Sequence, residues 1–218
     1  MIKCILFDFD GVLTIDKTGS TSITNYISQE TKISLDIIKA CYYKHNKKLL
    51  MGEIVHEDMW DQFCKDVGRQ IPYQILIDSF KNTALDEKMF KYIQELKSSY
   101  HIGMITDNKV DRIETILKHN HYEGYFDVVA ISAMLHSGKE DSRIFQYVLD
   151  EMNITASECV FIDNTAKNLV VPEKIGMKTI LFDDENRDFQ GFVRSLSTVL
   201  GLANSKARTN GARNKGCD

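Results

Sequence analysis

Two aspartates near the start of the chain, Asp8 and Asp10, are the residues whose type and spacing most clearly predict chemistry. They belong to the stretch KCILFDFDGVLT at residues 3–14, where every residue from 4 to 9 except Asp8 is apolar. Such a run is typical of a strand buried on both faces of a parallel sheet, with Gly11 allowing a sharp turn at its end. Ligands of open α/β sheets bind just beyond the carboxyl ends of strands, so we expect a functional site here.

Two carboxylates this close repel each other unless a cation lies between them or one of them holds a proton. A hard dication bound by oxygen ligands meets the first condition. Mg²⁺ suits a site that combines few protein carboxylates with the phosphate oxygens of a substrate. The pair therefore favours a magnesium site.

The stretch FDFDGVLT resembles the DxDGxx signature of the haloacid dehalogenase-like hydrolases, specifically their phosphatase branches. The resemblance implies that Asp8 is the catalytic nucleophile and Asp10 a general acid and base. Dehalogenases of this superfamily lack the second acid, so Asp10 favours phosphoryl transfer over carbon–halogen chemistry. The function implied is a Mg²⁺-dependent phosphatase that hydrolyses small phosphate monoesters, such as sugar phosphates, through an aspartyl-phosphate.

Two later stretches resemble further motifs of the same family. In HIGMITDN, Thr106 and Asp107 follow a short apolar run and resemble the motif that binds the transferring phosphoryl group, next to a helix N-terminus whose amides favour anions. Lys139 resembles the family lysine that stabilises charge on the nucleophile and the phosphate. Glu140 replaces the proline usual after that lysine, which removes a rigid turn and leaves the path of the loop open.

The stretch CVFIDN repeats the pattern of the first strand, and its acid, Asp163, resembles the metal-binding acid of the family. The implied metal ligands are Asp8, Asp10 through its backbone carbonyl, and Asp163. Asn164 stands where the family usually has a second acid, and because an amide carries no charge we expect weaker Mg²⁺ binding rather than its loss. A direct role of Asn164 at the metal stays open.

The periodicity of apolar residues predicts an α/β fold. Strands each followed by a helix, with right-handed crossovers, give a doubly wound parallel sheet with a Rossmann-like core. Strands are expected at residues 4–9, 102–105, 127–131, 160–162 and 178–182. Helices are expected at about residues 22–30, 34–52, 55–67, 72–82, 86–99, 108–119, 142–152 and 189–202.

Between residues 15 and 99 the sequence gives no strand signal, so we interpret residues 16–82 as a helical cap inserted after the first strand. Residues 1–15 and 83–202 then form the catalytic core, and residues 203–218 a disordered tail. The alternative is one domain without a hinge. Cap residues are expected to choose the substrate, and Trp60 either lines that pocket or belongs to the cap core.

Composition is that of an ordinary globular protein, with 43% hydrophobic and 27% charged residues and a net charge of −4. Because residues 203–218 are basic, the rest of the chain is more acidic than the net charge of −4 indicates, which argues against a nucleic-acid partner. No apolar stretch approaches the ~20 residues that cross a bilayer, so neither a signal peptide nor a membrane is expected. Five cysteines without a CxxC motif favour a reducing compartment. We expect a cytoplasmic monomer or homodimer whose partner is a small phosphorylated metabolite.

Two other functions remain open. A phosphosugar mutase of the same superfamily would pass the aspartyl-phosphate to a sugar instead of water. A catalytically weak binding protein would use the fold as a scaffold, with Glu140 and Asn164 as early signs of decay. The six histidines show no convincing metal-ligand spacing and are interpreted as structural or surface residues.

Overall fold

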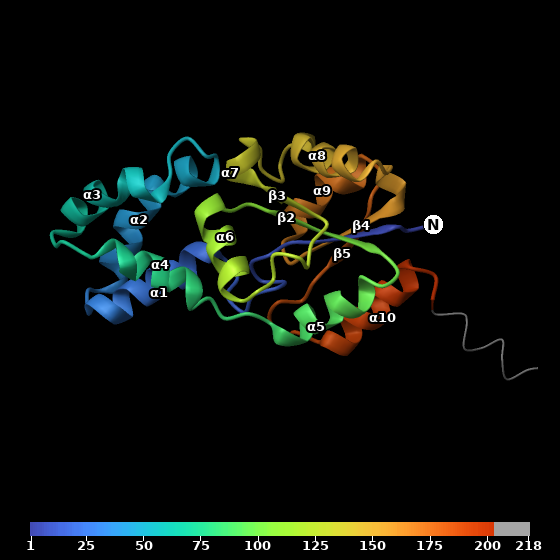
Figure 1. Ribbon diagram of the computed structural model, residues 1–218, viewed down its shortest axis with the longest axis horizontal. Helices are drawn as coiled ribbons and strands as arrows, with labels where there is room; N and C mark the ends of the chain where they lie inside the picture. Colours follow the sequence, from blue (N-terminus) through green and yellow to red (C-terminus); the bar gives the residue numbers. More distant parts are fainter. Residues whose placement is uncertain (203–218) are drawn as a thin grey trace, which may run out of the picture.

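The computed structural model describes residues 1–202, so the predicted tail at 203–218 lies outside the described residues. A five-stranded sheet with the order β3-β2-β1-β4-β5 forms the centre, and every neighbouring pair is parallel. The predicted doubly wound α/β sheet is confirmed (Figure 1). The strands are β1 Cys4–Phe7, β2 His101–Thr106, β3 Val128–Ile131, β4 Cys159–Asp163 and β5 Lys178–Leu181.

Helices cover both faces of this sheet. Alternate residues of β1 point to opposite sides: Cys4 and Leu6 join one buried cluster, Ile5 and Phe7 the other. The first cluster includes residues of α8 Ser142–Met152 and α9 Ala166–Lys174, and the second includes residues of α5 Glu87–Leu96, α6 Val110–His119 and α10 Phe189–Val199. Burial on both faces explains why β1 reads as a continuous apolar run.

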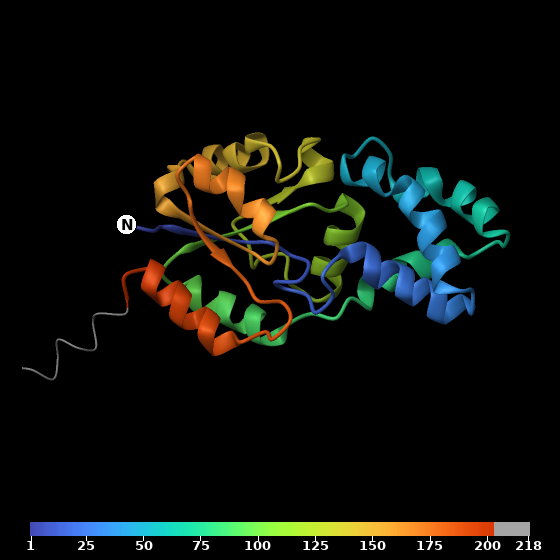
Figure 2. The same cartoon turned by 180° about the vertical axis from the view of Figure 1, so that it is seen from behind.

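Four further helices gather beyond the carboxyl ends of the strands, as Figures 1 and 2 show from opposite sides. The chain enters and leaves this group through two segments that lie side by side, since Thr14 and Leu85 form an antiparallel bridge. The Ile15 amide donates to the Ala84 carbonyl at 2.9 Å. The helices are α1 Gly19–Thr31, α2 Leu35–Leu50, α3 His56–Val67 and α4 Tyr73–Lys81.

One local prediction was wrong, and one short helix was missed. The first helix begins at Gly19, earlier than expected, because Thr18 has an extended backbone and its hydroxyl accepts from the Thr21 amide at 3.3 Å. The sequence also gave no sign of the four-residue helix α7, Ser132–Leu135, directly after β3. Within residues 1–202, the structure contains no helix whose length and hydropathy would suit a membrane span.

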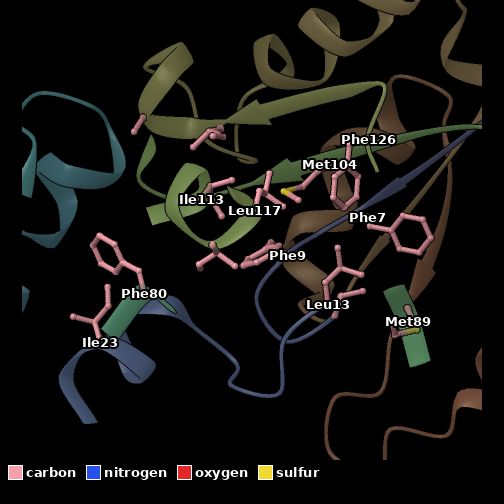
Figure 3. Close-up of a cluster of buried hydrophobic side chains, with 14 of the residues drawn as sticks. Phe7, Phe9, Leu13, Ile23, Phe80, Met89, Met104, Ile113, Leu117 and Phe126 are labelled. Carbon is pink, nitrogen blue, oxygen red and sulfur yellow. The ribbon is translucent and has the colours of Figure 1, made fainter. Parts of the chain in front are cut away.

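Helix α6 is fixed to the end of β1 by apolar packing. Figure 3 shows Phe9, in the loop after β1, beside Ile113 and Leu117 of α6, and all three belong to one buried cluster. Ile23 of α1 and Phe80 of α4 belong to the same cluster. The start of α6 is therefore held between the sheet edge and the four-helix group.

Candidate active site

The carboxyl end of β1 places Asp8 in a nearly closed environment, where it is 5% exposed. Its Oδ1 accepts from the Phe9 amide at 2.7 Å and lies 2.7 Å from Nζ of Lys139. Its Oδ2 accepts no hydrogen bond from the described residues. One oxygen of this carboxylate is thus held in place while the other keeps its lone pairs.

Lys139 bridges two acids that arrive from different strands. Its ammonium lies 2.7 Å from Asp8 and 2.7 Å from Oδ2 of Asp163, the last residue of β4. Burial works against the charge on Lys139, but the two carboxylates outweigh burial and raise its pKa. Burial raises the pKa of Asp8 to about 8 against the lowering effect of Lys139, since a single ammonium serves two buried acids.

Asp163 is fully buried and held by several donors. The Thr165 amide donates to its Oδ1 at 2.7 Å, and the Asn168 amide group donates to its two oxygens at 3.2 and 3.1 Å. Asn168 lies in the first turn of α9, and it acts there as a local hydrogen-bonding residue. The turn after β4 therefore orients the acid toward Lys139.

Asp10 turns its side chain to α6. Arg112, fully buried, donates from Nη2 to Oδ1 and from Nη1 to Oδ2 of Asp10, both at 2.9 Å. The Asn108 side chain donates to the same Oδ2 at 2.7 Å, and the Thr14 hydroxyl lies 3.4 Å from Oδ1. This bidentate pair fixes the plane of the carboxylate. Sequence reasoning missed both Arg112 and Asn108.

Thr106 ends β2 and is 1% exposed, and its hydroxyl accepts from Asn108 at 3.2 Å. The Asp107 carboxylate accepts from the Lys139 backbone amide at 3.0 Å, and burial raises its pKa. That bond holds the loop carrying Lys139 despite the missing proline. The side chain of Asp107 therefore positions Lys139, while a negative charge there disfavours direct contact with phosphate.

A cavity of about 330 Å³ at this edge of the sheet is lined by all the predicted site residues except Asp163. It is lined by Asp8, Asp10, Thr106, Asp107 and Lys139, and on the helical side by residues of α1 and α2. Its volume lies at the lower end of the range for small-molecule sites. Asp163 is not part of the cavity lining and reaches the site through Lys139.

The donor set here suits a divalent cation in part. Asp8 Oδ2 and the main-chain carbonyl of Asp10 accept no hydrogen bond from residues 1–202, and the pairing of two acids with one lysine leaves negative charge uncompensated. Hard oxygen donors with excess negative charge are what Mg²⁺ requires. However, residues 1–202 form no cluster of three acidic, histidine or cysteine side chains able to hold a metal, because Asp10 faces Arg112 and Lys139 separates the other two acids.

Asn164 lines the cavity, but its amide donates to Oδ2 of Asp184 at 2.9 Å. It also packs against Gly11, which has a φ of +82° and where a Cβ would overlap the Asn164 amide. Trp60 does not line this cavity: its Nε1 donates to the Ile71 carbonyl at 2.9 Å and its ring packs against Phe63. Trp60 therefore belongs to the core of the helical group.

Arg187 is another residue that the sequence did not reveal. Its guanidinium donates to the carbonyls of residues 11, 12 and 14 at 2.9 to 3.1 Å and pairs with Asp86 at 2.7 Å. These contacts tie the loop that carries Asp10 to the segment by which the chain returns from the helical group. An arginine in a polar turn gives no sequence signal for such a role.

Known proteins resemble this chain in sequence and in fold. Residues 5–182 match the family model of the haloacid dehalogenase-like hydrolases. Acyl-CoA dehydrogenase family member 10 of Mus musculus is 26% identical over 92% of this chain, but the match spans only 19% of that protein. D-ribitol-5-phosphate phosphatase of Bacteroides thetaiotaomicron is 23% identical over 85% of this chain and 93% of its own length.

Solved structures share the fold. The family enzyme bt-2542 of Bacteroides thetaiotaomicron superposes with a TM-score of 0.71 at 18% identity, over 88% of this chain and 98% of that one. The same enzyme in complex with magnesium and inorganic phosphate gives a TM-score of 0.67 over 88% of this chain and 100% of its own. With the family model covering most of its length, this chain belongs to the haloacid dehalogenase-like hydrolases.

Proposed function

We propose that this chain is a Mg²⁺-dependent phosphatase that hydrolyses small phosphate monoesters through an aspartyl-phosphate on Asp8. The observation that carries the proposal is the Asp8 carboxylate at the end of the central strand, with one oxygen held by Lys139 and the other free of hydrogen bonds to residues 1–202. The phosphatases among the relatives and the phosphate-bound fold neighbour support this reaction class.

Charge neutralisation is the first requirement of the reaction. Two unit charges 4 Å apart interact by about 4 kcal/mol at an effective dielectric constant of 20, so an anionic ester is repelled by the carboxylates. Lys139 offsets part of this repulsion, and the Thr106 hydroxyl together with nearby backbone amides can hold the phosphoryl oxygens. Asp8 and the Asp10 carbonyl would hold Mg²⁺, and Asp163 would join them only if Lys139 moved out from between the two acids. The ion would supply the remaining positive charge to the phosphoryl group.

Asp8 then attacks phosphorus and displaces the alcohol, and water later releases inorganic phosphate from the acyl phosphate. Asp10 gives a proton to the leaving alcohol and takes one from the water. Both oxygens of Asp10 accept from Arg112, so proton transfer requires one of these bonds to be exchanged for a bond to the substrate. Arg112 and Asn108 thereby orient the acid and base.

The division into a core at 1–15 and 83–202 and a cap at 16–82 belongs to the same proposal. Its support is the pair of adjacent connections joined by the Thr14–Leu85 bridge, and the position of α1 and α2 over the cavity. A cap in this place would exclude water from the acyl phosphate while its residues choose the leaving group.

The test is phosphate release from p-nitrophenyl phosphate with and without Mg²⁺, for wild type and Asp8→Asn. Loss of the nucleophile should lower kcat by more than ~10³-fold. Acid-quenched wild-type protein should retain radiolabelled phosphate from a labelled ester, and Asp8→Asn should not. Asp36→Asn, an exposed position on α2, serves as the control. Turnover of Asp8→Asn within tenfold of wild type contradicts the assignment, and glucose 6-phosphate formed from glucose 1-phosphate would indicate a mutase instead.

A further inference from the structure

Lys109 stands out among the buried basic residues. It precedes α6, is 4% exposed and lines the same cavity as Asp8. The other buried lysine and the one buried arginine of the described chain have carboxylate partners: Lys139 pairs with Asp8 and Asp163, and Arg112 pairs with Asp10. No carboxylate within residues 1–202 forms an ion pair with Lys109.

The hydrogen bonds around Lys109 form a chain in which each group donates to the next, from Lys109 through Ser20 to Asn46. Its Nζ donates to the Ser20 hydroxyl at 3.1 Å, and that hydroxyl donates to Oδ1 of Asn46 at 2.9 Å. The Asn46 Nδ2 group donates to nothing in the described part of the chain, and Ser20 and Asn46 also line the cavity. What this cluster offers to a ligand is therefore N–H donors: those of the ammonium and those of the amide.

We propose that Lys109, Ser20 and Asn46 form a subsite that binds a second anionic group, a carboxylate or a second phosphate, on the leaving-group part of the substrate. This inference rests on the proposed phosphatase function. An unpaired ammonium beside the Asn46 amide donor matches the oxygens of an anionic group, which both accept hydrogen bonds and neutralise the charge. A substrate hydroxyl would accept a bond but leave the charge unbalanced.

The surroundings of Lys109 agree with a ligand that brings negative charge. Burial, with the nearby Arg112 guanidinium, lowers the pKa of Lys109 to about 7. The closest aromatic face, that of Tyr42, lies 5.8 Å from Nζ and compensates only weakly for lost hydration. Lys139 and Lys109 line the same cavity, so a small molecule with two anionic groups could engage both lysines.

Matched substrate pairs test the subsite. 3-Phosphoglycerate differs from glycerol 3-phosphate by a carboxylate, and fructose 1,6-bisphosphate differs from fructose 1-phosphate by a phosphate. We expect wild-type kcat/KM to favour the more anionic member of at least one pair, and the favoured pair identifies the group. Lys109→Met, which keeps the length of the side chain, should raise KM for that member by ~10-fold or more, while KM for its partner changes less than about twofold. Equal losses for both members, or none, would overturn the proposal.

A binding measurement separates this proposal from the phosphatase itself. Calorimetric titration of the four esters into Asp8→Asn protein, with and without Lys109→Met, requires no turnover. One outcome is that wild type hydrolyses no ester, while Asp8→Asn protein binds the more anionic member of a pair more tightly and loses this preference when Lys109→Met is added. That result supports the subsite and refutes the proposed activity. If turnover occurs without such a preference, the subsite fails alone.

Two further variants guard against indirect effects. Lys118→Met makes the same change at an exposed position of α6 and should preserve the preference. Asn46→Ala, on a half-buried residue of α2, should weaken the same preference without removing a buried charge, and circular dichroism checks the fold of each variant. A preference that survives both Lys109→Met and Asn46→Ala contradicts the inference.

Discussion

The pair between Arg112 and Asp10 gives the most quantitative prediction. The Arg112 side chain is fully buried and the Asp10 side chain is 11% exposed, so both charges are largely removed from water. Arg112→Met keeps an unbranched apolar stem against the Phe9 ring, which lies 5.7 Å from the guanidinium carbon. The change therefore removes charge and hydrogen bonds with little loss of packing.

The expected cost follows from the charge that remains. Removing one member of a buried ion pair typically costs about 3–5 kcal/mol, because the other member stays buried without a partner. Asn108 still donates to Asp10 at 2.7 Å in the variant, which places the expectation near the lower end, at about 3 kcal/mol. For a chain of this size such a loss lowers Tm by roughly 6–12 °C.

Urea unfolding followed by circular dichroism measures the effect, and a double-mutant cycle identifies its source. Asp10→Asn removes the charge that Arg112 compensates, so the double variant should be more stable than the sum of the single losses predicts, by about 2 kcal/mol or more. Arg143→Met is the matched control: Arg143 also forms a 2.9 Å pair, with Asp141, but its side chain is 68% exposed. A surface pair of this kind should contribute about 0–1 kcal/mol.

A loss of less than about 1 kcal/mol in Arg112→Met, as at a surface pair, would contradict a strong buried pair. A double-mutant cycle that is additive within about 0.5 kcal/mol would also contradict it, since independent sites behave that way.

Two further predictions concern positioning and pH. The Arg187 guanidinium holds the loop of Asp10 and pairs with Asp86. Arg187→Gln should therefore lower the unfolding free energy by about 1.5–3 kcal/mol, and it should reduce kcat by a larger factor than it changes KM. His56 is fully buried between the Tyr42 hydroxyl at 2.8 Å and Asp111 at 2.7 Å, and burial lowers its pKa below the usual 6.5, more than Asp111 raises it. The stability contributed by its neutral form is complete above pH 6.5 and is lost as the pH falls below that value toward its lowered pKa.

Each of these two predictions has a control within this protein. Arg194→Gln, at a side chain that is 72% exposed, should leave stability and kcat close to wild type. Unfolding free energies of wild type and His56→Gln between pH 5 and 8 isolate the histidine, since other groups titrate alike in both proteins. An equal pH dependence of the two proteins, or an Arg187→Gln variant as active and stable as the control, would contradict the respective prediction.

The sheet and its strand-end residues were predictable because they rest on local patterns. An acid that ends a buried apolar run, as Asp8 and Asp163 do, is costly without a function, and parallel strands bring such ends to one edge. Lys139 and Thr106 were found through motif resemblance, and the structure places them at the same cavity. The start of α1 was missed because a threonine turn gives several equivalent N-caps in the sequence.

The contacts of α6 could not be predicted from the sequence, because they join residues that lie far apart along the chain. Residues 108–112 read as a polar helix start, yet four of them reach distant partners: Lys109 contacts Ser20, Asp111 contacts His56, and both Asn108 and Arg112 contact Asp10. The pairs are separated by 89, 55, 98 and 102 positions, and the partners lie on two helices of the four-helix group and on the loop after β1. Polar residues at a helix start are solvent-exposed by default, and only burial beneath the four-helix group turns them inward. Because the same short segment holds Asp10 and contacts two of those helices, a shift of the four-helix group over the cavity would change the position of the Asp10 carboxylate through α6.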